Sequence, residues 1–342
     1  MPQKYWSLPV ITLGLAALSL TPVRPADAKS KAAPVVITEG NPNAVLWRDP
    51  VDIASRNLYY GSGGEKNQPH APYTFVEEDM NGTNPKIVVT DRDGVKWTVK
   101  LGIEARPETA ASRLVWAAGY FTNDDYYLAD LQVANMPPHL KRGAKLVAPD
   151  GTMHDARLKR HNSGEKEEGN WKWRAAPFAG TREFDGLKVM MALVNNWDLK
   201  DDNNKIYSLK DSGEQIYEVS DIGATFGTPG MSFPFRHSKG DVDAYARSKF
   251  IAKITQEYVN FRTPTRPSIM YAGRPRSFIQ RTHLDGLLNN VPRDDARWMG
   301  QLLSRLSASQ IQDAFRAADY APNQIDEFSK TVEDRIAELN RL

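Results

Sequence analysis

The chain changes from short β-rich runs to amphipathic helical stripes, and this change constrains its fold more than any other feature. Three runs rich in β-branched and aromatic residues lie at 73–78, 86–90 and 96–101. An Asn-Gly pair at 81–82 and the segment Asp-Arg-Asp-Gly at 91–94 separate them, and both are strong turn signals. The spacing predicts three antiparallel strands in a meander.

Helical periodicity begins after the third run. Apolar residues recur at helical spacing in 107–119, β-rich residues return at 126–133, and 187–194 is apolar nearly all round, as in a buried helix. From about 293 onward, apolar residues repeat every three or four positions. We therefore predict an α+β fold of two lobes, a small antiparallel β-rich N-lobe at 46–136 and a mostly helical C-lobe at 137–342.

Residues 137–175 are unusually rich in Lys, Arg, Gly and Glu. We predict a charged, loosely structured insertion in the C-lobe. Basic and aromatic side chains here could instead bind an anionic or sugar substrate, but a solvated charged surface is the simpler interpretation. They are Arg157, Lys159, Arg160, Trp171, Lys172, Trp173 and Arg174.

The first residues are typical of a secretory signal peptide. Lys4 precedes a mostly apolar run at 8–20, and the small residues of Ala26-Asp27-Ala28 are suited to cleavage. An uncleaved anchor is the alternative, although the run is shorter than the ~20 residues that a spanning helix needs. We predict a signal peptide at 1–28, a linker at 29–45, a periplasmic or secreted location, and no transmembrane segment after cleavage.

Charge and cysteine content exclude several classes of function. Lys and Arg number 44 against 42 Asp and Glu, so the formal net charge is +2 and no field recruits nucleic acid. The chain has no cysteine, which excludes disulfides, thiolate catalysis and cysteine-bound zinc. Its six histidines show no metal-ligand spacing.

Lys100 lies in the third predicted strand between apolar neighbours. A buried amine needs an anionic partner. Glu108, in the first turn of the next predicted helix, is the expected partner, and Glu104 is the competitor.

The segment Asn-Trp-Asp-Leu-Lys-Asp-Asp-Asn at 196–203 follows the predicted buried helix. Phosphoryl transfer requires an aspartate near the acceptor hydroxyl, positive charge on the moving group and oxygen ligands for a divalent metal. Asp198, Lys200 and Asn203 could supply these groups. An Asp/Asn-rich turn that ends the helix is the structural alternative.

Asp221 stands in the segment Asp-Ile-Gly at 221–223, after a short apolar run at 216–219. Its carboxylate is a second expected metal ligand. Asp-x-Gly is a weak signal alone, but here it follows Lys100 and Asp198 in the order that phosphoryl-transfer enzymes use.

Residues 73–260 resemble the atypical branch of protein-kinase-like proteins, which includes HipA-like bacterial kinases, phosphoinositide kinases and secretory-pathway kinases. The resemblance rests on the motifs at 97–100, 196–203 and 219–223. It implies an ATP-dependent phosphotransferase that uses Mg²⁺ or Mn²⁺. Its partners would be a nucleotide and an unknown hydroxyl-bearing acceptor.

The chain departs from ordinary protein kinases in three respects. No Gly-x-Gly-x-x-Gly precedes Lys100, no His-Arg precedes Asp198, and no Ala-Pro-Glu follows Asp221. The turn at 80–85, with Gly82, is the better candidate for covering the phosphates. Control by a phosphorylated activation loop is unsupported.

Three functions remain open from the sequence. The first is phosphoryl transfer from ATP to a hydroxyl on a protein, lipid or glycan. Because a periplasm holds little ATP, the second is transfer of the nucleotide itself, or use of another phosphate donor. The third is a catalytically silent kinase-fold protein that binds a ligand or an envelope partner.

Overall fold

The computed structural model describes residues 41–82, 84–229, 238–262, 284 and 286–342. The predicted signal peptide at 1–28, and most of the predicted linker at 29–45, lie outside these residues. In the part of the chain that is described, no helix combines the length and the apolar character needed to span a membrane.

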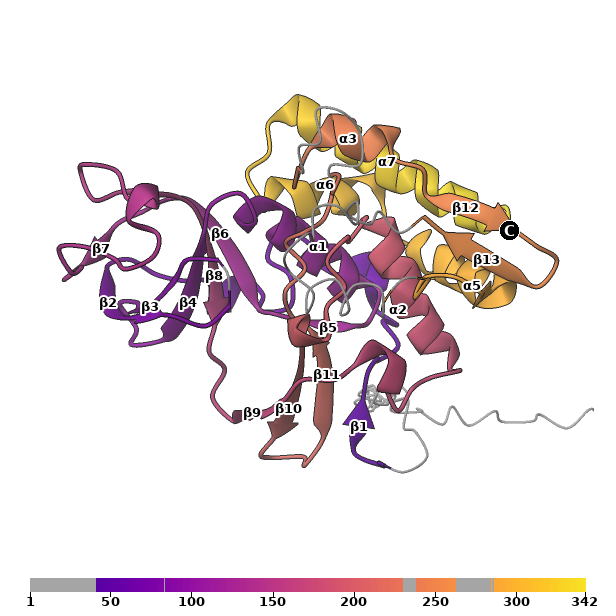
Figure 1. Cartoon of the computed structure of the whole chain (residues 1–342), viewed down its shortest axis with the longest axis horizontal. Coiled ribbons are helices and arrows are strands. Elements are labelled where there is room, and N and C mark those ends of the chain that lie inside the picture. Colours follow the sequence, from indigo (N-terminus) through magenta and orange to yellow (C-terminus); the bar gives the residue numbers. More distant parts are fainter. Residues whose placement is uncertain (1–40, 83, 230–237, 263–283, 285) are drawn as a thin grey trace, which may run out of the picture. The chain divides into compact units, whose positions relative to one another are not determined.

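A six-stranded sheet forms the N-terminal part (Figure 1). Its strand order is β6-β8-β4-β3-β2-β7, and every pairing is antiparallel except that of β2 with β7. The strands are β2 (Tyr73–Asp79), β3 (Lys86–Thr90), β4 (Lys96–Leu101), β6 (Asp125–Leu131), β7 (Val133–Ala134) and β8 (Met153–Arg160). The predicted meander of three strands is confirmed as β2, β3 and β4.

Alternation along β4 separates the two faces of this sheet. Trp97 and Val99 point into an apolar cluster with residues of β3, β6 and β8, whereas Lys100 is buried among carboxylates. Because successive side chains of a strand point to opposite faces, one face is an apolar core and the other carries charge.

The expectation of a loosely structured insertion at 137–175 is wrong for 153–160, since β8 lies inside the sheet between β6 and β4. Met153, Ala156 and Leu158 of this strand are buried in the apolar cluster. Charged residues alternate with these apolar ones along the strand. In the sequence, the high overall charge of the segment made this two-residue alternation difficult to recognise.

A second sheet lies beside the first and carries the Asp221 turn at the end of β11. Its path is β1-β11-β10-β9, and β5 also pairs with β11. Ala44 and Val45, expected in the linker, form β1 instead. The strands are β1 (Ala44–Val45), β5 (Phe121–Thr122), β9 (Glu165–Gly169), β10 (Asn204–Leu209) and β11 (Gln215–Val219).

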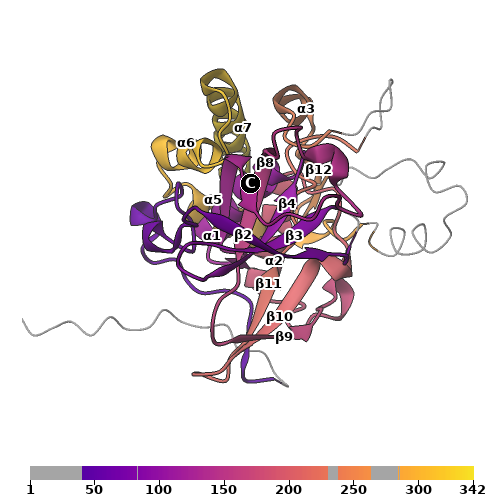
Figure 2. The same cartoon turned by 90° about the vertical axis from the view of Figure 1, so that its left-hand side faces the viewer.

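Helices dominate the C-terminal part, and in the views of Figures 1 and 2 α3, α6 and α7 lie on the side opposite β9, β10 and β11. The predicted α+β division, with an antiparallel β-rich part followed by a mostly helical one, is confirmed. Among the described residues the α-helices are α1 (Ala105–Ala117), α2 (Arg182–Leu193), α3 (Val242–Arg247), α5 (Arg293–Leu303), α6 (Ala308–Arg316) and α7 (Pro322–Asn340).

Smaller elements complete the described residues. A three-stranded sheet has the order β12-β13-β14. Its strands are β12 (Ile251–Ile254), β13 (Tyr258–Phe261) and β14 (Val291–Pro292). Short 3-10 helices occur at Ile53–Ser55, Glu65–Asn67, Ala144–Leu146, Trp173–Ala175 and Asp201–Asn203.

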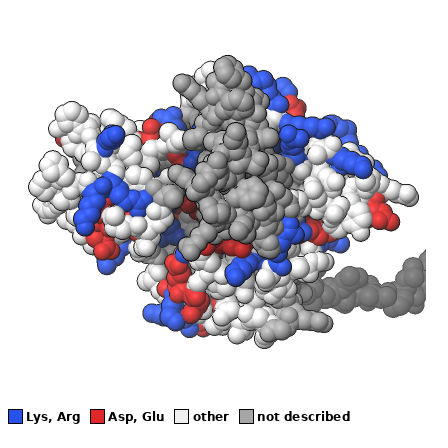
Figure 3. Space-filling view, in the orientation of Figure 1, with Lys and Arg blue, Asp and Glu red and all other residues white. Residues whose placement is uncertain are grey.

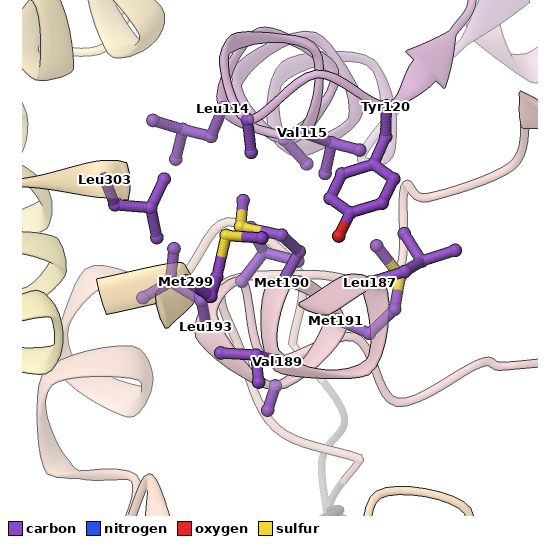
Figure 4. Close-up of a cluster of buried hydrophobic side chains, with 14 of the residues drawn as sticks. Leu114, Val115, Tyr120, Leu187, Val189, Met190, Met191, Leu193, Met299 and Leu303 are labelled. Carbon is purple, nitrogen blue, oxygen red and sulfur yellow. The ribbon is translucent and has the colours of Figure 1, made fainter. Parts of the chain in front are cut away.

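The main hydrophobic core joins α1, α2 and α5 (Figure 4). Leu114 and Val115 of α1 face the methionines of α2, and Met299 and Leu303 of α5 close the cluster. The predicted buried helix at 187–194 is thus confirmed as the greater part of α2. This packing fixes α1, which carries Glu108, against the helix from which the segment 196–203 departs.

Trp97→Ala should unfold the protein more easily, because the indole is fully buried against Tyr126 and its N–H donates to Asp91. We expect a loss of about 3–5 kcal/mol in the free energy of unfolding, measured by urea denaturation. Tyr59→Ala, at a side chain 45% exposed, is the control and should change it by less than about 0.5 kcal/mol. Equal effects would contradict the packing described for the sheet.

Candidate functional site

The ammonium group of Lys100 is the centre of the site. It donates to Glu108 at 2.7 Å, to Asp221 at 2.8 Å and to Glu104 at 3.0 Å, and its side chain is only 3% exposed. Although burial alone lowers the pKa of Lys100, the three carboxylates raise it well above its usual range. The amine therefore remains charged, and both proposed glutamate partners are real contacts.

The order of residues after β4 explains how two glutamates reach one lysine. Gly102 has a φ of +89°, which a residue with a Cβ rarely adopts, and lets the chain turn directly from β4 into α1. Glu104 is the N-cap position of α1, and Glu108 lies one turn later. Residues four apart share a helix face, so both carboxylates point at Lys100.

Arg157 lies on the other side of Glu108. Its guanidinium donates to Glu108 at 2.9 Å and lies 3.3 Å from Asp125, and all three side chains are buried. Burial raises the pKa of Glu108 to about 7, against the opposing charges of Arg157 and Lys100. The sequence placed Arg157 in a solvated insertion; the structure makes it part of the charged cluster.

The Asp221 turn reaches Lys100 from β11. Burial by itself raises the pKa of Asp221, but the charge and hydrogen bond of Lys100 hold it well below its usual range. Two residues on, a Cβ at Gly223 would lie 2.8 Å from the Cβ of Glu104, so only glycine allows the turn to approach α1 this closely. This gives the glycine of Asp-x-Gly a packing role.

The segment 196–203 is tied to the same turn by its backbone. The N–H groups of Ser220 and Asp221 donate to the carbonyl of Asn203 at 3.0 and 3.1 Å, and the N–H of Trp197 donates to Ala224 at 3.1 Å. These bonds fix the predicted acceptor segment beside the predicted metal ligand.

Within that segment the side chains hold one another. The ammonium of Lys200 lies 2.9 Å from Asp198, and the amide Nδ2 of Asn203 donates to the carbonyl of Asp198 at 2.7 Å. The charge of Lys200 also contributes to the low pKa of Asp221. The N–H of Asp198 donates to the side chain of Asn196 at 2.9 Å, so the segment also forms the Asp/Asn-rich turn of the structural alternative, and its catalytic role stays a prediction.

Gly82 lies in the turn between β2 and β3, with a φ of +69°. Its carbonyl accepts a hydrogen bond from Arg142 at 2.9 Å, and Asn84 of the same turn donates to Glu104. The turn is thus linked to the charged cluster through Asn84, while contact of Gly82 with a phosphate stays a prediction.

Lys239 is the further residue that the sequence did not suggest. Its ammonium contacts Glu104 and lies 5.4 Å from the ring centre of Trp197. Nothing in the local sequence indicates this, because the contact joins residues 135 positions apart.

The oxygen donors fit a hard divalent cation. Carboxylate oxygens of Glu104, Glu108 and Asp221 lie within 4.8 Å of one another among the described residues. Mg²⁺ and Mn²⁺ prefer such oxygen ligands. Because Lys100 already pairs with all three carboxylates, the best ligand candidate among them is Asp221, whose side chain is 45% exposed. The side-chain oxygen of Asn203 stays a predicted second ligand.

A lysine on the third strand of a meander, paired with a glutamate of the following helix and with an Asp-x-Gly aspartate, is the arrangement of a protein-kinase-like fold. The structure brings Lys100, Glu108 and Asp221 into direct contact. The backbone carbonyl of Asn203 accepts the N–H of Asp221, which ties the segment 196–203 to this group. The fold is therefore kinase-like in the arrangement of these groups.

No protein-family model and no curated protein sequence matches the chain. Among solved structures, the proinflammatory kinase CtkA of Helicobacter pylori is 10% identical, with 78% of this chain and 93% of that chain covered at a TM-score of 0.40. A Golgi casein kinase is 10% identical, with 80% and 71% covered, at a TM-score of 0.40. The MAP kinase LmaMPK10 of Leishmania major is 11% identical, with 79% and 94% covered, at a TM-score of 0.20.

Arg157→Met should destabilise the protein strongly, because it leaves Glu108 and Asp125 buried without their shared cation. Removal of one partner from a buried ion pair costs about 3–5 kcal/mol. Denaturant unfolding measures this loss. Arg92→Met, at a side chain 61% exposed beside Asp93, is the matched control and should cost less than about 0.5 kcal/mol. A loss below about 1 kcal/mol for Arg157→Met would contradict the buried network.

Asp221→Asn should change how stability depends on pH. A carboxylate whose pKa is depressed in the fold stabilises it above about pH 4, the value of the unfolded chain, and loses that contribution as pH falls through the folded value. Solvent screens the pair because Asp221 is 45% exposed, so we expect an advantage of wild type on the order of 1 kcal/mol at pH 7. Urea unfolding from pH 7 to pH 3 should show this advantage shrinking; a constant difference would exclude the Lys100–Asp221 pair as its source.

Proposed function

We propose that this protein is a metal-dependent phosphotransferase that moves a phosphoryl group from ATP to a hydroxyl on a protein, lipid or glycan. The observation that carries the proposal is the contact of Lys100 with both Glu108 and Asp221, made by one buried ammonium at 2.7 and 2.8 Å. A lysine held in this way is positioned to meet anionic phosphate oxygens.

Lys100 would bind the donor phosphates, and Glu108 would hold the ammonium in place. Gly82 would bring the turn between β2 and β3 over the phosphates. Asp221 and Asn203 would hold Mg²⁺ or Mn²⁺, which when bound would neutralise charge on the phosphates.

Asp198 would orient the acceptor hydroxyl and receive its proton, and Lys200 would neutralise charge on the moving phosphoryl group. The Lys200–Asp198 contact of 2.9 Å supports this division of roles, since it places a cation beside the base. A positioned general base contributes about 10²–10⁴-fold to such a rate.

We further propose that the protein acts in the periplasm or is secreted. The support is the N-terminal pattern of a basic residue, an apolar run and a small-residue cleavage site at 26–28. On the face shown in Figure 3, the basic and acidic groups that can be seen are intermixed, so the described residues of this face form no basic patch of the kind that binds nucleic acid. In such a compartment the identity of the phosphate donor is the first property to measure.

Mature protein at 29–342 should gain thermal stability with ATP and Mg²⁺ or Mn²⁺. Asp221→Ala should abolish this shift, because it removes a metal ligand. Asp198→Ala should lower transfer of the γ-phosphate to a mixed protein and glycan acceptor pool by about 10²–10⁴-fold while nucleotide affinity changes less than about twofold. Asp211→Ala, at an exposed aspartate in the turn after β10, is the control and should change neither readout.

The same experiment separates the competing functions. Absence of a shift with every nucleotide and metal would refute both enzyme hypotheses. Transfer of label from the α-phosphate rather than the γ-phosphate would identify a nucleotidyl transferase. Binding that survives without transfer to any acceptor would indicate a silent kinase-fold binding protein.

A further inference from the structure

One carboxylate of the site receives more donors than its role in holding Lys100 requires. Glu104 accepts hydrogen bonds from Lys100 at 3.0 Å, from Asn84 and from Lys239. Lys100 would still pair with Glu108 and Asp221 if Glu104 moved. Release of Glu104 would therefore leave the charge of Lys100 compensated and would free three hydrogen-bond donors for another anion.

The three donors come from three separate parts of the chain. Lys100 lies on β4, Asn84 belongs to the turn between β2 and β3, and Lys239 follows the Asp221 turn in sequence. Lys100 and Asn84 donate to Oε2, whereas Lys239 donates to Oε1. Two ammonium groups and an amide thus converge on one anion from different sides.

Lys239 is held firmly in this position. The N–H groups of Ser238 and Gly240, on either side of it, donate to the carbonyls of Thr228 and Thr225 at 2.8 and 3.0 Å. Its side chain is 11% exposed and lies over the ring of Trp197. A lysine fixed by its backbone on both sides loses little conformational freedom when it changes one anionic partner for another.

Two ammonium groups and an amide can also bind a terminal phosphate. A phosphate, like the carboxylate of Glu104, accepts charge-assisted hydrogen bonds through several oxygens. Glu104 itself is buried, but Ile103, directly before it, is 66% exposed, so the displaced carboxylate would have to rotate toward the surface at Ile103.

We propose that the carboxylate of Glu104 occupies, in the ligand-free protein, the position of the donor's terminal phosphate, and that Lys239 and Asn84 are phosphate-binding residues. Binding of the donor displaces Glu104 and transfers its three hydrogen-bond donors to phosphate oxygens. This inference rests on the proposed function, which supplies the phosphate donor. In this arrangement Glu104 competes with anions for the three donors, and only an anion of higher charge, such as a terminal phosphate, displaces it.

Isothermal titration calorimetry with MgATP, MgADP and inorganic tripolyphosphate tests the proposal. Glu104→Gln keeps the size of the side chain and removes its charge, so ATP and tripolyphosphate should bind about tenfold tighter. Lys239→Met should weaken ATP about tenfold, with ADP changed less than about threefold, because the contact is to the terminal phosphate. In the double variant the gain from Glu104→Gln should fall below about threefold, since the lysine that it frees is gone.

Lys330→Met is the matched control, because Lys330 pairs with Asp334 on the exposed surface of α7 and should leave all affinities unchanged. Circular dichroism and thermal melting check folding, and Lys239→Gln replaces Lys239→Met if the latter does not fold. A full tenfold gain from Glu104→Gln in the Lys239→Met background would overturn the proposal.

The probes also separate this inference from the proposed function. If ATP binds but responds to neither substitution, the inference alone is wrong. If tripolyphosphate follows the expected pattern while no nucleotide binds, the inference stands and the nucleotide as donor is wrong. If no variant binds any of the three anions, both are wrong.

Discussion

The burial of one ammonium group organises this structure. An unpaired charge in a protein interior is prohibitively costly, so Lys100 requires carboxylates that themselves come from elsewhere in the chain. Glu108 ties it to α1, Asp221 ties it to the end of β11, and Arg157 of β8 compensates the excess of negative charge. These ion pairs hold the six-stranded sheet, α1 and the Asp221 turn together at one point.

The charged cluster separates two apolar regions. One covers the apolar face of the six-stranded sheet around Trp97, and the other joins α1, α2 and α5 around Met190 and Met299. Apolar residues in place of the cluster would often be as stable or more so, because a buried ion network returns little net free energy. Its presence is therefore better explained by chemistry than by stability, which agrees with the proposed role in phosphate binding.

The sequence predicted the parts of the fold whose signals are local. Turn residues between short β-rich runs located β2, β3 and β4, and helical periodicity located α2 and the C-terminal helices. The order of Lys100, Asp198 and Asp221 was sufficient to suggest a common site. The role of Arg157 in the site was not predicted, because a charged strand next to buried carboxylates has the same composition as a solvated insertion.

Contacts between distant positions could not be predicted. Lys239 meets Glu104 across 135 positions, and only the folded chain brings them together. The sequence favoured Glu108 over Glu104 as the partner of Lys100, whereas the structure pairs Lys100 with both, because one helix turn places both carboxylates within reach. Residue spacing shows that two side chains share one face of a helix, but it does not show which of them contacts a given partner.

The carbonyl of Asn203 accepts the N–H groups of both Ser220 and Asp221, so the segment that carries Asp198 and the turn that carries Asp221 share one anchor. A ligand that shifts either segment must act on the other through this anchor. Binding free energies are reciprocal. Under the proposed function, an acceptor that changes the affinity for metal and nucleotide by some factor would have its own affinity changed by the same factor when they bind. A substrate could then be sought by its effect on donor binding before any product is detected.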